Sequence, residues 1–545
     1  MRHAATIEPG DGKHEIEAIL LRLRAFPSGW MAALVCMGIV ALAISLYFTM
    51  QATAISLFAV CVLVPLLWLV WIRPVFGILF LIFLTASFVQ PNVIDLRVLG
   101  GGLSLRDLAL IGLLVGGIVR KLLYNKLEIP WWRVSLPLLT FISVAALSAL
   151  YAIFLEGVST NWALSEFRAI FYLATFFAIA WNIDQVKDVF ILFIGLIILA
   201  DLTAMVIFMQ QFLGRDNLLL TAMLGNGWYI RDAAVAAGQF GDVRVVPPGN
   251  VMMYMVTILV FALLLQANQP RGRRLFFAGQ FLYLTTAILF TYTRAEWIAC
   301  ALGAAIVVLF LPKLDKARLA RYLATIGVVF ALVYVLFTGI IQQFLAQQFV
   351  GNVTSRALTI FTPDVTLDTS SLQWRLFENG KAIDSISQYP VFGVGLGNSY
   401  RDVTLLQWED RRFYFRKTRF VHNSYLYIAV KMGIIGLASF LLFCMAFLTM
   451  GWLAFKKMAE GDFKRMTIAV LASFGGLLFW ANTQMHYMTV ESTAVVGLMV
   501  GLVAAMARLK AADTVQETQQ SVSRSYPAKM AIASSPLNLA TKEQS

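Results

Sequence analysis

Long uninterrupted apolar stretches constrain this chain more than any other feature. Segments of roughly 18–25 apolar residues recur along it, and each is long enough to cross the ~30 Å hydrocarbon core of a bilayer as one helix. Because 59% of the 545 residues are hydrophobic and only 13% are charged, the chain has too few polar side chains to cover a water-exposed surface. The sequence therefore predicts an all-α, polytopic membrane protein.

The pattern predicts about fourteen spans. The first of them carries no small-residue cleavage pattern, so we expect it to stay as a helix rather than to be removed as a signal peptide. The expected spans are 29–50, 52–72, 74–90, 104–120, 134–154, 165–182, 188–213, 250–267, 274–292, 295–312, 321–340, 424–450, 466–486 and 490–508.

The distribution of basic residues predicts the orientation of these spans. Lys and Arg cluster in every second connection, whereas the alternate short loops are almost free of them, which is the positive-inside pattern. Both termini are therefore expected in the cytoplasm. This placement explains the net charge of +13 better than a nucleic-acid partner does. The basic clusters fall within 2–24, 120–133, 271–274, 313–321, 456–465 and 508–510.

The same parity places two long connections, 214–249 and 341–423, on the outer side of the membrane. Loops of this length are uncommon unless they are functional. The tail is rich in Ser, Gln, Ala and Thr and is expected to remain unfolded. The chain then divides into a cytoplasmic segment 1–28, N-terminal transmembrane helices 29–240, a central region 241–450 whose loop 341–423 holds short helices, C-terminal transmembrane helices 451–510 and a disordered cytoplasmic tail 511–545.

His422 lies at the expected outer mouth of the helix that begins near Asn423. A neutral imidazole can accept a proton at ordinary pH, although a lone histidine can equally cap a helix or lie at the lipid interface. The preceding run 409–423 contains five basic and four aromatic residues, Arg416 and Arg419 among them. The planar arginine fork matches phosphate oxygens, so this run favours an anionic substrate. Contact with lipid head groups is the alternative for its outermost members.

A second outer site is expected at "FTYTRAEW" (290–297), where Arg294 and Glu296 lie between two spans. Charges near membrane depth are costly unless they are paired or functional, so the two residues either pair with each other or Arg294 binds phosphate. Arg244 occupies a comparable position before the next span. Asp201 and Lys431 lie within spans and can pair with polar groups or line a water-filled cavity; neither receives a role.

The sequence predicts no nucleotide site, no metal and no other cofactor. The glycine turn "YPVFGVGLGNSY" (389–400) fails the G-x-G-x-x-G pattern because Asn398 occupies its third required position. The chain also has no G-x-x-x-x-G-K-[ST] loop and no D-x-D pair. All four cysteines lie in predicted spans, where they act as small apolar residues.

Three outer segments together resemble the superfamily of O-antigen ligases and Wzy-type polymerases, which are bacterial membrane glycosyltransferases. The segments are "YTRAEW" (292–297), "YPVFGVGLGNSY" (389–400) and "HNSYLYIAVKMGIIGL" (422–437), within a region of roughly 240–450. The resemblance implies a fold of the C-type glycosyltransferase kind in the bacterial inner (plasma) membrane. The outer side, on which the two long connections are expected, is then the periplasm. It also implies transfer of a glycan from undecaprenyl diphosphate to a saccharide hydroxyl, such as that of lipid A-core, in lipopolysaccharide or exopolysaccharide biosynthesis.

The resemblance also implies roles for individual residues. Arg244 and Arg294 would hold the diphosphate and His422 would act at the acceptor, in a metal-independent reaction that inverts the anomeric centre. The wider set expected to bind the diphosphate or the glycan is Arg244, Arg294, Arg375, Arg416, Arg419 and Asn423. The chain departs from the superfamily at Lys431, where an acidic residue is common, and at 247–250, where Pro-Pro-Gly-Asn replaces a Pro-Asn pair.

Two alternatives accompany this interpretation. A repeat-unit polymerase uses the same motifs as a ligase; the His-Asn motif resembles the ligase group more closely. A transporter or flippase of lipid-linked sugars is the alternative from another class, with Asp201 and Lys431 as mid-membrane sites. The concentration of Arg and His at the outer mouth favours the enzyme.

Overall fold

The computed structural model describes most of the chain between Arg73 and Ser525. The predicted spans 29–50, 52–72 and 321–340, and the last twenty residues of the tail, 526–545, lie outside the described residues. The described ranges are 73–86, 104–123, 128–213, 229–232, 243–247, 249–266, 269–310, 312, 316–317, 319–320, 369–408, 411–415 and 418–525.

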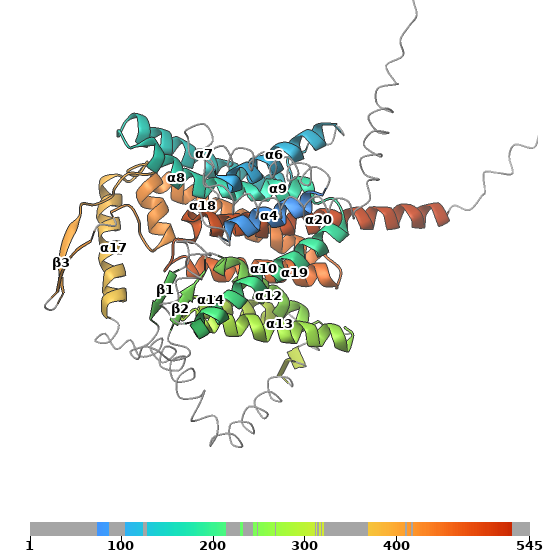
Figure 1. Ribbon diagram of the computed structural model, residues 1–545. Helices are drawn as coiled ribbons and strands as arrows, with labels where there is room; N and C mark the ends of the chain where they lie inside the picture. Colours follow the sequence, from blue (N-terminus) through green and yellow to red (C-terminus); the bar gives the residue numbers. More distant parts are fainter. Residues whose placement is uncertain are drawn as a thin grey trace, which may run out of the picture.

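The described residues form a bundle of helices with two small β-hairpins at one end (Figure 1). The hairpins pair β1 (Tyr229–Asp232) with β2 (Val243–Val246) and β3 (Thr404–Trp408) with β4 (Arg411–Phe415). The helices are α4 (Pro74–Thr85), α6 (Leu105–Leu123), α7 (Trp132–Phe154), α8 (Thr160–Phe171), η1 (Tyr172–Ala174), α9 (Thr175–Asn182), α10 (Val186–Leu213), α12 (Asn250–Leu264), α13 (Arg271–Phe290), α14 (Arg294–Leu309), α17 (Thr369–Gln388), α18 (Ser424–Lys457), α19 (Asp462–Trp480), η3 (His486–Met488) and α20 (Val490–Ser525).

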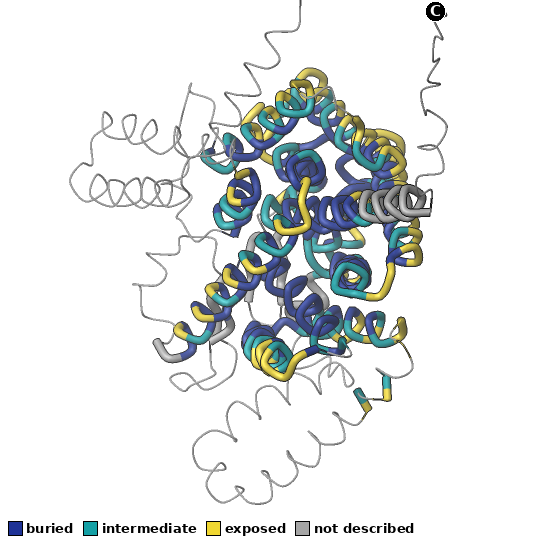
Figure 2. The backbone as a smooth tube through the Cα atoms, turned by 90° about the vertical axis from the view of Figure 1, so that its right-hand side faces the viewer, coloured by how far each residue is buried: buried dark blue, intermediate teal, exposed yellow. Residues whose placement is uncertain are grey.

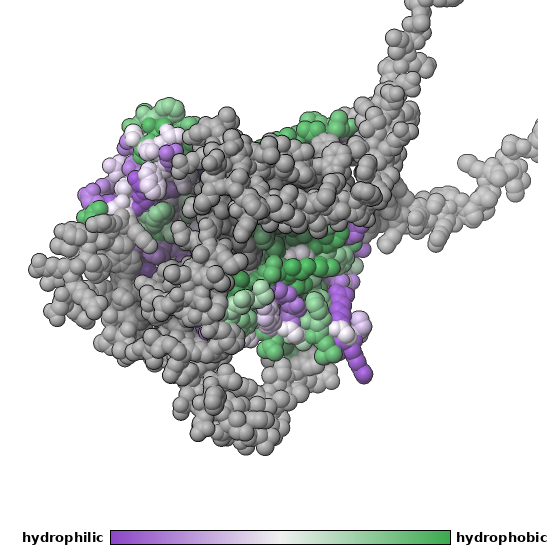
Figure 3. All heavy atoms as spheres, viewed as in Figure 1, coloured by the Kyte–Doolittle hydropathy of each residue, from purple (hydrophilic) through white to green (hydrophobic). Residues whose placement is uncertain are grey.

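Six segments of the described part are long and apolar enough to cross a membrane: α7, the continuous run α8–η1–α9, α10, α18, α19 and the first part of α20. Large apolar side chains cover the outside of several, such as Leu147 on α7 and Met445 on α18, which are 65% and 66% exposed. Such a surface requires lipid around it. Figure 3 shows hydrophobic residues between hydrophilic patches at either end, and Figure 2 shows buried helices at the centre. The all-α membrane class is thus confirmed, whereas fourteen spans remain a prediction.

Three features differ from the sequence-based expectation. Helix α19 ends at Trp480 instead of continuing to residue 486, and a turn and η3 follow it. Helix α20 continues to Ser525, so the tail expected to be disordered from residue 511 begins as helix; its Ala, Gln and Glu residues are good helix formers. Each of the two long connections, 214–249 and 341–423, contains a β-hairpin, and the second also contains a helix, α17.

A chain of contacts places the N-termini of three helices at one end of the bundle. Asn250 of α12 donates from Nδ2 to Glu296 of α14 at 2.8 Å. The ring of Tyr254, one turn further along α12, lies 5.9 Å from that of Trp480, where α19 ends. The next residue, Ala481, accepts a backbone hydrogen bond from Ser424, the first residue of α18, at 2.9 Å. We call this the α17 end; in Figure 1 it lies on the left, with α17 and the hairpins.

Helix α18 is broken at Gly433, whose φ of 64° and ψ of −164° are not helical. In a continuous helix the amide of Ile434 would donate to the carbonyl of Val430. Here Ile434 N donates instead to Pro390 O at 2.8 Å, and Val430 O accepts from Val394 N at 2.8 Å. The turn 389–400 therefore satisfies both groups released by the break, as membrane-buried backbone requires.

The tight approach of the turn to α18 generates a prediction about Gly433. A Cβ on Gly433 would collide with the carbonyl of Val391, and its left-handed φ disfavours any side chain. We expect Gly433→Ala to lower the free energy of unfolding by at least about 2 kcal/mol, measured by denaturation of the purified protein in detergent. Gly279→Ala is the control, because Gly279 lies at an exposed position of α13 with nothing within 4 Å of the added Cβ. Equal stability of the two variants would contradict the prediction.

Candidate active site

The start of α18 is built by its capping residue, Asn423. Its side-chain oxygen accepts hydrogen bonds from the amides of Tyr425 and Leu426 at 2.9 and 3.2 Å. Asparagine is a favoured N-cap because it satisfies amides that have no partner within the helix. The cap fixes where the helix begins and therefore where His422, the residue before it, lies. Asn423 thus has a structural role in addition to the substrate-binding role predicted for it.

His422 forms a close pair with Glu378 of α17. The ring nitrogen Nδ1 lies 2.5 Å from Glu378 Oε2, and the backbone amide of His422 donates to the same oxygen at 3.3 Å. The Glu378 side chain is 1% exposed, whereas that of His422 is 30% exposed. An ionised carboxylate can only accept hydrogen bonds, so with Glu378 in this form the contact assigns the proton to Nδ1. Nε2 is then the nitrogen with a lone pair for a partner from solvent or substrate.

Glu378 was not among the residues singled out from the sequence. Its position follows from the helical periodicity of α17, because Glu378, Ala382 and Ser385 are all buried and recur at intervals of four and three residues. A carboxylate on the buried face of an amphipathic helix is rare unless it is paired. That signal was available in the sequence, but its partner, 44 residues further along the chain, was not.

Tyr400 and Arg401 lie beside this pair. Arg401 Nε donates to the Tyr400 hydroxyl at 3.2 Å, and its guanidinium lies 5.5 Å from the ring centre of Phe377, the neighbour of Glu378. Burial raises the pKa of Tyr400 above its usual value, with the nearby Arg401 opposing the shift. Tyr400 is therefore a neutral hydroxyl at physiological pH. Arg401 is a further cation near His422 that the sequence interpretation did not include.

Lys431 holds the glycine turn against α8 and α18. Its ammonium lies 3.2 Å from the carboxylate of Glu166 on α8 and donates to the carbonyl of Asn398 at 2.5 Å. The amide of Gly397 donates to Glu166 Oε2 at 2.6 Å, and both oxygens of this carboxylate lie 3.2 Å from the ammonium. The Lys431 and Glu166 side chains are only 0% and 7% exposed. This pair explains the basic residue at position 431 as a structural anchor.

The predicted arginines have different surroundings. The Arg419 guanidinium stacks over the Trp162 ring of α8 at 3.9 Å. Arg375 lies on α17, one turn before Glu378, and is half-buried. Arg416 lies outside the described residues. Arg375, Arg419, Asn423 and His422 are thus all on segments that meet at the α17 end.

Arg294 and Arg244 belong to a neighbouring part of the same end. Arg294 is the first residue of α14 and is half-buried. Glu296, 0% exposed, accepts hydrogen bonds from Asn250 and from Thr291, each at 2.8 Å. Arg244 stands opposite Arg231 in the β1–β2 hairpin, and β2 packs against α13, which ends just before Arg294. The convergence of Arg244, Arg294 and His422 on one cavity remains a prediction.

Asp201 and Lys431, the two residues on which a transporter would depend, both form polar contacts within the protein. Lys431 is engaged with Glu166 and Asn398, whereas Asp201 accepts from Gln280 Nε2 of α13 at 3.0 Å. These contacts account for both charges without a transport role, because a charged residue within a span is tolerated when it is paired.

Comparison with known families supports the resemblance seen in the sequence. Residues 279–441 match the O-antigen ligase family, and this stretch runs from α13 through α14, α17 and the glycine turn into α18. No curated protein matches the chain. The match covers less than a third of the chain and supports the superfamily of O-antigen ligases and Wzy-type polymerases, whose members are of the glycosyltransferase type. The fold of the described residues is that of a multi-pass membrane protein, as this superfamily requires.

A second histidine at the α17 end, His486, has the opposite surroundings to His422. It is 8% exposed, its ring lies 4.2 Å from that of Trp480, and Nε2 has no hydrogen-bond partner among the described residues. Burial lowers the pKa of His486 to about 3, so it is neutral at physiological pH. Because it is enclosed, it is unsuited to accept a proton from a substrate.

The lowered pKa of His486 predicts acid sensitivity. An unfolded histidine binds a proton below about pH 6.5, whereas the folded protein resists protonation of His486 until about pH 3. The stability contributed by neutral His486 is therefore present above pH 6.5 and is lost as the pH falls, by about 1.4 kcal/mol per pH unit. We expect His486→Phe to flatten the fall of Tm between pH 6.5 and 4.5. An unchanged slope would contradict this assignment.

Proposed function

We propose that this protein transfers a glycan from undecaprenyl diphosphate to a saccharide hydroxyl on the periplasmic side of the bacterial inner membrane. The pairing of half-exposed His422 with buried Glu378, within the region that matches the O-antigen ligase family, carries this proposal. The enrichment of basic residues at the opposite end of the helices supports a periplasmic location for the α17 end.

In the proposed reaction His422 acts as the general base. Nε2 removes the proton from the acceptor hydroxyl while the hydroxyl oxygen attacks the anomeric carbon. The bond between that carbon and the diphosphate oxygen breaks, and its electrons leave with undecaprenyl diphosphate. Glu378 orients the imidazole and stabilises the imidazolium that forms, as a carboxylate does for a histidine base. Direct displacement of this kind inverts the anomeric centre.

The donor side requires cations because the leaving diphosphate gains negative charge. Preorganised arginines in a partly water-excluded site stabilise such charge effectively. We assign this role to Arg294 and Arg244. The further residues that we expect to bind the diphosphate or the glycan are Arg375, Arg416, Arg419 and Asn423. The diphosphate is a good leaving group once its charge is balanced, so the proposed mechanism is metal-independent. A membrane-borne donor also suits a site at the mouth of apolar helices.

A ligase is the preferred form of this activity, and a repeat-unit polymerase is the second candidate. The ligase moves a finished chain to lipid A-core or another acceptor, whereas the polymerase extends the chain. We expect deletion of the gene to leave long polymer on the lipid carrier, detected by electrophoresis of the lipid-linked fraction. Accumulation of single repeat units would assign the polymerase instead.

The His422–Glu378 pair predicts a graded loss of activity. His422→Ala should lower the rate of transfer about 10²–10⁴-fold, because a positioned base contributes that much. Glu378→Gln should lower it less, because the base remains but loses its orienting carboxylate. The assay is glycan transfer and carrier release by the purified protein in liposomes containing a lipid-diphosphate glycan and candidate acceptors.

Two controls accompany this assay. Asp384→Asn removes a carboxylate from the exposed face of α17, where it pairs with Lys381, and should leave transfer unchanged. Donor binding by His422→Ala should also be retained, since the arginines that bind the diphosphate are intact. Wild-type transfer rates in His422→Ala would exclude the residue from catalysis.

A further inference from the structure

A cavity of about 890 Å³ lies among the C-terminal ends of α6 and α9 and the middle of α20. Its residue Arg508 is 18 positions along α20 from Val490, which corresponds to about 27 Å of helix. The cavity is therefore separated from the α17 end by roughly the thickness of a bilayer core. We call this second region the Arg508 end. It is also the end at which the basic residues of 271–274 and 456–465 lie.

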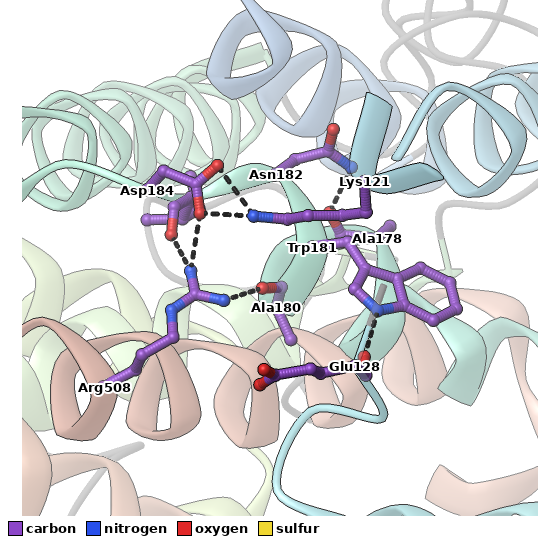
Figure 4. Close-up of polar contacts among 9 residues, drawn as sticks. Lys121, Glu128, Ala178, Ala180, Trp181, Asn182, Asp184 and Arg508 are labelled. Carbon is purple, nitrogen blue, oxygen red and sulfur yellow. Dashed lines mark hydrogen bonds and ion pairs between the residues drawn. The ribbon is translucent and has the colours of Figure 1, made fainter. Parts of the chain in front are cut away.

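Two cations in this cavity share one carboxylate (Figure 4). Lys121 Nζ lies 2.8 and 3.0 Å from the two oxygens of Asp184, and Arg508 Nη2 lies 3.1 Å from Oδ1 of the same residue. Arg508 also donates to the carbonyls of Ala180, at 2.7 Å, and Ile183. The guanidinium is thus held in place by the end of α9. One carboxylate cannot neutralise both cations.

The remaining charges in the cavity wall leave it positive. Arg120 and Glu128 also line it, so the described lining residues include three basic and two acidic ones. A cavity with a net positive charge and several hydrogen-bond donors suits a phosphate group, because charged donors bind phosphate oxygens strongly.

The surroundings of the cavity are those of a membrane–water boundary. Trp131 and Trp181 line it, and Trp181 Nε1 donates to the carbonyl of Glu128 at 3.2 Å. Tryptophan is enriched at this depth because its ring is apolar and its N–H is polar. Beside them, Ile129 and Trp132 are 64% and 60% exposed. A phosphate bound by the basic residues would thus lie next to an apolar surface that suits acyl chains.

We propose that this cavity binds the head group of an anionic phospholipid, with Arg120, Lys121 and Arg508 as the residues that recognise its phosphate. Basic pockets between transmembrane helices on the cytoplasmic side are suited to such head groups. The site is distinct from the glycan-transfer site and does not depend on the proposed function. It would link α6, α9 and α20 through a lipid at the end opposite His422.

The test is a titration of the purified full-length protein with phosphatidylglycerol, read by native mass spectrometry. We expect phosphatidylglycerol to bind more tightly than phosphatidylcholine. Lys121→Gln should weaken phosphatidylglycerol binding about fivefold, the effect of about 1 kcal/mol for one basic residue near a head group. The control is Lys457→Gln, which removes an exposed lysine outside the cavity and should change the affinity less than twofold.

Asp184→Asn separates lipid binding from a purely structural role of the ion pairs. Removing this carboxylate makes the cavity more positive, so it should strengthen phosphatidylglycerol binding, a result that partial unfolding cannot produce. Equal binding of the two lipids, or weaker binding by Asp184→Asn, would overturn the proposal. Displacement of the lipid by millimolar inorganic phosphate would also overturn it, because the cavity would then be a site for free phosphate.

Discussion

The exchange of backbone hydrogen bonds between the glycine turn and α18 is the interaction on which the candidate active site depends. The break at Gly433 removes the hydrogen bond between the Ile434 amide and the Val430 carbonyl. The Ile434 amide donates instead to Pro390, and the Val430 carbonyl accepts from Val394. Unpaired amides and carbonyls are costly away from water, so the break in α18 and the turn require each other. The part of α18 before the break, which begins at Ser424 after its cap Asn423, is thereby oriented by a segment that directly follows α17. His422 and Glu378 come from these two elements.

Two buried carboxylates stabilise this arrangement from different sides. Glu166 reaches from α8 to Lys431 and to the amide of Gly397, while Glu378 reaches from α17 to the ring and the amide of His422. A buried ion pair offsets its desolvation only when further hydrogen bonds satisfy the same groups. Lys431 meets this condition through the carbonyl of Asn398. Each carboxylate therefore also accepts a backbone hydrogen bond, Glu166 from Gly397 and Glu378 from His422. These bonds restrict the positions of the glycine turn and of the residue before α18.

Hydrophobic length and local composition predict much of the fold but little of this geometry. The expected spans 134–154 and 188–213 agree with α7 and α10 to within two residues at each end, because uninterrupted apolar runs report helix length directly. The break at Gly433 was not predictable, because the sequence around it is an ordinary apolar helix and the turn that displaces its hydrogen bond is distant in the chain. His422 could be selected from its arginine-rich surroundings. The helical periodicity of α17 marks Glu378 as a buried carboxylate, but its pairing with His422 could not be predicted, since a residue pair across elements is tertiary information.

The two histidines at the α17 end show that surroundings, rather than residue type, determine which can act as a base. His486 is packed against Trp480 and faces no charged partner in the described structure, so burial keeps it neutral and out of reach of a substrate. His422 has a carboxylate at Nδ1 and partial exposure of its ring. The carboxylate selects the tautomer and would stabilise the ring as it gains a proton, while exposure lets an acceptor hydroxyl approach Nε2. A general base needs both conditions at once, and within the described structure His422 is the histidine that meets them.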